Sequence, residues 1–99
     1  RIELDFFVDS DHDLQAVHRS VVTAMQQLNY ICDGKPVEIY FSDFRDNAVK
    51  MSVWFWIDNH APPGYMVARH EAIFNIVDAL KSKGISLMVP QTIQSIKNN

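Results

Sequence analysis

The residues best suited to chemistry begin with the acidic stretch at 9–13, which reads DSDHD. It starts like the D-x-D-x-D of a calcium-binding loop, in which oxygens at alternate positions ligate the ion. Such a loop also needs glycine at its sixth position and a bidentate glutamate at its twelfth, where this chain has Leu14 and Ser20. We therefore interpret these aspartates as helix-capping acids, which accept the free N–H groups at a helix start.

Histidine and cysteine supply no better site. His70 opens an H-E-x-x-H pattern typical of zinc helices, but Phe74 stands where the second histidine belongs. His12 and His18 are six residues apart, which places them on opposite sides of a helix. Cys32 has no C-x-x-C partner, and only the fold could bring a histidine to it as a base. The sequence therefore predicts no catalytic residue, no metal ligand and no cofactor, and the chain is expected not to be an enzyme.

Composition and charge narrow the class of protein. With 99 residues, 47% of them hydrophobic, the chain suits one domain and is too apolar to be disordered. No run approaches the ~18 consecutive apolar residues of a membrane span. The net charge of −3 argues against a nucleic-acid partner, since proteins that bind nucleic acids usually carry a basic patch that neutralises the phosphates. Because the chain starts at Arg1 without an initiator methionine, we expect it to be a piece of a longer protein.

Hydrophobic periodicity predicts six elements that position these residues. Alternation with a period of two indicates strands, and apolar residues at helical spacing indicate helices. The expected strands cover 2–8, 37–42, 48–58 and 85–89, and the expected helices cover 12–29 and 65–83. A hairpin is expected around residues 45–47. The expected buried stripes are Leu14, Val17, Val21, Ala24, Met25 and Leu28 on the first helix, and Met66, Ile73, Val77 and Leu80 on the second.

The order of the elements predicts the fold. Strand, helix, strand, strand, helix, strand with two right-handed crossovers is the order of a ferredoxin-like βαββαβ sandwich. This α+β fold has an antiparallel sheet with two helices on one face, and its first and third strands lie centrally. We place the domain at residues 1–90 and a tail at 91–99.

The sheet face that the helices leave uncovered is the most informative surface. It should present Glu3, Asp5, Phe7, Glu38, Tyr40, Lys50, Ser52, Trp54 and Trp56. Exposed aromatic groups of this kind mark contact surfaces. The alternative is that both tryptophans pack beneath the 59–64 loop or a terminal tail. Stacking of RNA bases is disfavoured, because three acids share this face and the Lys/Arg-Gly-aromatic signature is absent.

Three segments together resemble one known family. The first is RIEL at 1–4, leading through a strand to Asp9 and Asp11 at a helix start. The second is FSDFRDN at 41–47, running into VWFWI at 53–57. The third is the helix from 69 to 83, closed by Gly-Ile and followed by Pro-Gln at 90–91. In this order and spacing they resemble the cytoplasmic C-terminal domain of the small-conductance mechanosensitive channel (MscS) family. The family often has a proline where this chain has Met88.

The resemblance implies a part in a membrane channel. Such channels are homoheptamers of the inner membrane, with membrane helices upstream of this domain in the same chain. Seven copies enclose a cytoplasmic vestibule with portals for ions and small solutes. The tail at 91–99 would then begin a strand of an axial barrel.

Two hypotheses join the resemblance to the residues. Phe7, Tyr40, Trp54 and Trp56 are expected at or near a contact between subunits or domains. Asp9, Asp11 and Asp13 are expected to edge a portal and to bias which ions enter. The alternative function is a ferredoxin-like regulatory or small-ligand-binding module of a multidomain protein, which would need a pocket at the sheet edge.

Overall fold

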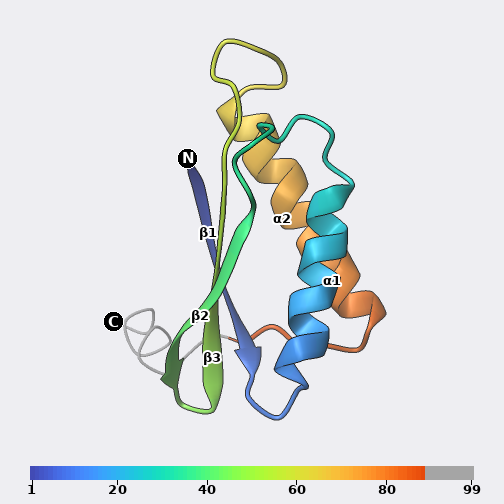
Figure 1. Cartoon of the computed structure of the whole chain (residues 1–99). Coiled ribbons are helices and arrows are strands. Elements are labelled where there is room, and N and C mark those ends of the chain that lie inside the picture. The colour runs from blue at the N-terminus through green and yellow to red at the C-terminus, as the bar shows by residue number, and fades with distance from the viewer. Residues whose placement is uncertain (89–99) are drawn as a thin grey trace, which may run out of the picture.

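Two helices pack against one face of a three-stranded antiparallel sheet in the computed structural model, which describes residues 1–88 (Figure 1). The sheet order is β1-β3-β2, so β3 is central. The elements are β1 (Ile2–Asp9), α1 (Leu14–Gln26), β2 (Glu38–Arg45), β3 (Ala48–Phe55) and α2 (Tyr65–Ser82). The predicted α+β class, with an antiparallel sheet and two helices on one face, is confirmed.

The strand predicted at 85–89 is reduced to one bridge within the described residues. Val8 pairs with Leu87 in an antiparallel bridge, and the Met88 N–H donates to the Phe7 carbonyl at 2.7 Å. Ile85 is buried in the core instead of lying on the sheet, so only a short stretch is left to pair with β1. The predicted domain boundary at residue 90 and the tail at 91–99 lie outside the described residues.

The predicted hairpin between β2 and β3 is confirmed. Asp46 and Asn47 form its turn with φ angles of 54° and 62°, a left-handed conformation that Asp and Asn tolerate better than most residues. A register shift between Phe41 and Asp43 interrupts the pairing of β2 with β3. Ser42 is the extra residue of this bulge, which blunts the edge strand.

The stripe on the first helix is confirmed and the one on the second is partly wrong. Val17, Val21, Ala24 and Met25 of α1 are buried as expected, whereas α2 buries Ala68, Ala72, Ile76 and Leu80. Met66 was expected inside and is 70% exposed. The side of α2 that faces the core contains the small residues Ala68 and Ala72, so the helix is rotated relative to the stripe drawn through its larger side chains. Ile73 and Val77 are then left half-buried on the flank.

Candidate functional site

The sheet face opposite the helices is the candidate site, and we refer to it as the open face (Figure 1). Pairing of β1 and β2 with the central strand β3 brings its side chains into rows across the sheet. Its members on the strands are Glu3, Asp5, Phe7, Glu38, Tyr40, Lys50, Ser52 and Trp54, with Trp56 just beyond the end of β3.

Aromatic contacts dominate one end of the open face. Trp54 lies between Glu3 of β1 and Glu38 of β2. The Tyr40 ring meets the Trp54 ring edge to face, with centroids 5.3 Å apart and an interplanar angle of 66°. The guanidinium carbon of Arg1 lies 4.3 Å from the centroid of Trp54, in cation–π geometry. Trp54 is therefore half-buried by its own chain, whereas Tyr40 remains 48% exposed.

Trp56 lies beside the loop that follows α1. The Cys32 N–H donates to the Trp56 carbonyl at 2.8 Å, and Ile31 bridges to Ile57. This pairing brings the Lys35 ammonium within 4.3 Å of the Trp56 ring centroid. Trp56 nevertheless stays 36% exposed. Neither tryptophan is fully buried, which disfavours the alternative that both pack beneath the 59–64 loop. The other part of that alternative, a covering terminal tail, lies outside the described residues.

A polar seam separates Phe7 from the other aromatic residues. Ser52 is 5% exposed at the centre of the face, where its hydroxyl donates to Asp5 Oδ1 at 2.9 Å and lies 3.1 Å from the Ser42 hydroxyl. Lys50 lies 3.9 Å from Asp5 and pairs in register with Phe7. The four predicted contact residues therefore share a face, but only Tyr40, Trp54 and Trp56 gather at one end of it.

Charged side chains lie next to the aromatic rings at this end of the open face. The charge of Glu38 raises the pKa of Tyr40, with loss of hydration and the hydrogen bond from the Tyr40 hydroxyl to Glu38 Oε1 acting in the same direction. The cations over the indoles were not predicted. Arg1 could have been found, because it has the same strand parity as Glu3 and Asp5. Lys35 comes from a loop, where no periodic signal exists.

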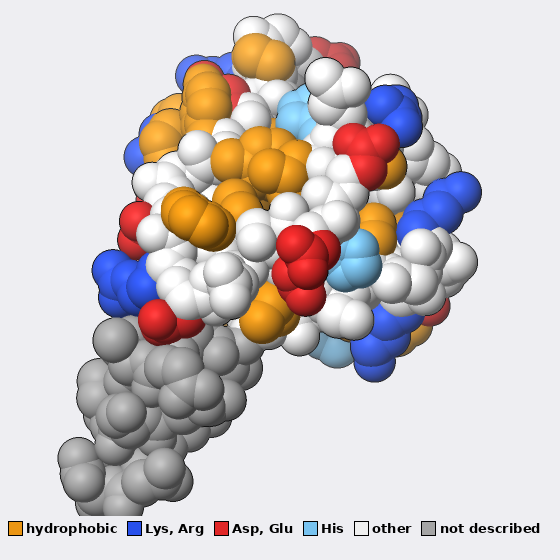
Figure 2. Space-filling view, turned by 90° about the horizontal axis from the view of Figure 1, so that it is seen from below, with side chains coloured by type: hydrophobic (Ala, Val, Ile, Leu, Met, Phe, Trp, Pro, Cys, Tyr) orange, Lys and Arg blue, Asp and Glu red, His pale blue; other side chains and the backbone are white. Residues whose placement is uncertain are grey.

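Two of the acids proposed to edge a portal have local structural roles. Asp13 caps α1, its Oδ1 accepting the N–H groups of Gln15 at 3.0 Å and Ala16 at 3.4 Å. Asp9 Oδ1 accepts the Asp11 N–H at 2.9 Å within the preceding turn. Figure 2 shows this end of the molecule, where acidic side chains are interspersed with hydrophobic and basic ones. The capping interpretation is confirmed for Asp13 alone, because α1 begins at Leu14, so that Asp9 and Asp11 lie in the turn before it. The portal role stays a prediction.

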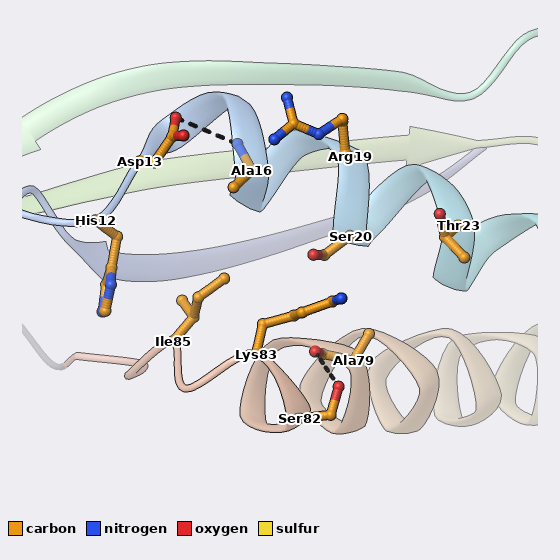
Figure 3. Close-up of a pocket in the computed structure, with 10 residues that line it drawn as sticks. All are labelled: His12, Asp13, Ala16, Arg19, Ser20, Thr23, Ala79, Ser82, Lys83 and Ile85. Carbon is orange, nitrogen blue, oxygen red and sulfur yellow. Dashed lines mark hydrogen bonds between the residues drawn. The ribbon is translucent and has the colours of Figure 1, made fainter.

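A groove of about 610 Å³ separates α1 from the end of α2 (Figure 3). Lys83 reaches along the gap between the two helices, and Arg19 lies on the α1 wall. His12 Nε2 accepts the Ser86 N–H at 3.1 Å, which ties the segment after α2 to the start of α1. Ser82 donates to the Ala79 carbonyl at 2.8 Å. These two hydrogen bonds are structural, and neither joins a nucleophile to a base.

Residues 1–88 hold no cluster of three or more side chains suited to a metal ion. The hollow of about 760 Å³ beside Cys32 has no histidine among the residues that line it. Over the same residues, none of the helices combines the length and the apolar character that crossing a membrane requires.

The chain is similar to known proteins in sequence pattern and in fold. The family model described as "Mechanosensitive ion channel MscS, C-terminal" matches residues 2–87. The crystal structure of Helicobacter pylori MscS in its closed state superposes with a TM-score of 0.80 at 22% sequence identity. That match covers 90% of this chain but 34% of the other, so this chain spans about a third of that structure's length. The chain has no significant match among curated proteins.

Proposed function

The chain belongs to the mechanosensitive ion channel MscS family, as its C-terminal domain, and from this premise we propose that it forms part of a vestibule wall in a homo-oligomeric channel. Channels of this family are membrane proteins, and the family is not an enzyme family. The observation that carries the proposal is the family match over residues 2–87, nearly all of the described chain. The match in fold to a closed channel structure supports it.

The proposed assembly has seven copies of the full protein. Membrane-spanning segments upstream in the same chain would place this domain on the cytoplasmic side of the inner membrane. The copies would enclose a space through which ions and small solutes reach the pore, with Asp9, Asp11 and Asp13 near an opening. The partners of the domain are then its sister copies and its own membrane region, and no nucleic acid or cofactor is required.

The aromatic end of the open face is the proposed subunit contact. Tyr40 and Trp56 are exposed on it, and Trp54 is half-covered beside them. Large aromatic side chains of this kind supply most of the binding energy where proteins meet. Phe7, beyond the polar seam, would lie at the border of the contact.

Removing the two indoles tests this role. Trp54→Ala together with Trp56→Ala in the full-length protein should weaken the oligomer, because truncating each buried interface aromatic costs on the order of 2 kcal/mol. Native mass spectrometry would show smaller assemblies at the expense of the heptamer. Phe44→Ala is the matched control, because Phe44 is an aromatic residue that is 66% exposed but lies off the open face. It pairs in register with the core residue Val49, so the two share the opposite side of the sheet. A heptamer as stable as the wild type would remove the open face from the contact.

A further inference from the structure

Helix α2 has a second apolar side that faces away from the core. Met66 is 70% exposed, Phe74 64% and Val67 46%, although all three are large hydrophobic residues. Side chains three, four, seven and eight positions apart share one side of a helix. We define the outer face of α2 as Met66, Val67, His70, Phe74 and Val77, which lies opposite the buried Ala68, Ala72, Ile76 and Leu80. A helix that is apolar on opposite sides is usually covered on both.

A hollow lies on the outer face of α2. It has a volume of about 380 Å³ and extends along the helix from His70 to Lys81. Ile73, Phe74 and Val77 supply apolar walls, and His70, Asp78 and Lys81 supply polar groups around them. Apolar hollows with a polar rim are where the anchoring aromatic residues of protein contacts insert.

Ring symmetry identifies the occupant of this hollow, and this step rests on the proposed function. More than two identical chains close into a ring only by head-to-tail contacts, in which each chain contributes two different surfaces. The open face supplies one surface. Both helices pack on the sheet face opposite the open face (Figure 1). The open face and the outer face of α2 therefore lie on the two outer sides of the sandwich. We propose that the outer face of α2 receives the aromatic end of the open face from a neighbouring copy of this chain.

Chemistry at the two surfaces is complementary. Tyr40 and Trp56 are the exposed aromatic rings on the open face, at 48% and 36%, and either can enter the hollow. Glu38 lies next to Tyr40, and Lys81 lies at the rim of the hollow. Within residues 1–88 Lys81 forms no ion pair, so it is available to a carboxylate of the neighbour. Opposite charges at the rim of a contact orient the partners as they meet.

Cysteine cross-linking in the full-length protein tests the pairing. Cys32→Ser removes the thiol of this domain, any cysteine elsewhere in the full-length protein is likewise replaced by serine, and Tyr40→Cys with Phe74→Cys then places one thiol on each proposed surface. A short bifunctional maleimide should produce a ladder of covalent oligomers in membranes that carry the double variant. Either single variant alone should stay uncross-linked, because in a head-to-tail contact each surface meets only the other one. Tyr40→Cys with Gln15→Cys, exposed on α1, is the matched control and should give no ladder.

The outcomes separate this inference from the proposed function. Dimers from Phe74→Cys alone would mean that α2 meets α2, which overturns the pairing. Absence of a ladder from the double variant, with the oligomer intact by native mass spectrometry, would overturn it too and leave the proposed function standing. A monomeric wild-type protein in the same measurement would instead overturn the proposed function itself.

Discussion

At the scale of single residues, a few side-chain contacts hold the elements in place. The Tyr30 hydroxyl donates a short hydrogen bond to Glu71 Oε1 and so ties the loop after α1 to the middle of α2. Burial raises the pKa of Tyr30 above its ordinary value of 10.0, and the hydrogen bond and the charge of Glu71 raise it further. The phenol therefore stays protonated in the folded protein at pH values where it would ionise in the unfolded chain.

This linkage predicts a stability difference that depends on pH. Tyr30→Phe should cost about 1 kcal/mol near pH 8, because it removes one partly exposed hydrogen bond to a charged acceptor. Because the pKa of Tyr30 is raised in the folded state, its hydrogen bond contributes fully to the free energy of unfolding below pH 10.0. This contribution is lost as the pH rises from 10.0 through the folded-state pKa. Urea unfolding at a series of pH values should therefore show the gap between wild type and variant narrowing above pH 10.0. Tyr65→Phe, at an exposed tyrosine, should leave stability nearly unchanged; a gap independent of pH would contradict the account.

At the scale of elements, alternation was a better guide than helical spacing. The period of two identified β1, β2 and β3, because residues on one side of a strand can turn only to the core or to the open face. The open-face composition followed from the same parity. The buried stripe of α2 was partly missed, because this helix has apolar residues on two sides. The larger side chains, such as Met66, indicated the exposed side, whereas the buried side contains small alanines. Nothing local showed that Ala68 and Ala72 lie on the buried side of α2.

The close approach of the two helices can be tested by adding volume. Ala72→Leu should destabilise the fold by about 1–3 kcal/mol, because Ala72 is fully buried and a larger side chain would overpack the interface. Val67→Leu enlarges an apolar side chain by one methylene on the exposed side of the same helix and should stay within about 0.5 kcal/mol of wild type. Denaturant midpoints of the two variants measure the difference. Equal stabilities would mean that the alanine side of α2 is not tightly packed in the core.

At the scale of the whole molecule, the sandwich presents chemically different surfaces on its sides and ends. Its two outer sides expose aromatic and aliphatic groups, on the open face and on the outer face of α2. One end holds Asp9, Asp11 and Asp13 in the turn before α1, and the other holds the loops at 30–37 and 58–64 (Figure 1). Exposed apolar groups on both sides suit a subunit that packs laterally against its neighbours.

If the acidic end borders a portal, its charge should influence which ions enter. Asp9→Asn, Asp11→Asn and Asp13→Asn together remove three negative charges while keeping the capping oxygens, since Asn caps a helix about as well as Asp. The loss should shift the reversal potential of the full-length channel, under a salt gradient, toward weaker preference for cations. The shift should shrink at high salt, because charges separated by more than ~10 Å are screened at 0.1 M. Asp33→Asn with Asp58→Asn, at the opposite end, is compared with Asp9→Asn and Asp11→Asn alone, so that each double variant loses two negative charges. An equal shift from the two double variants, or no shift in the triple variant, would place the portal elsewhere.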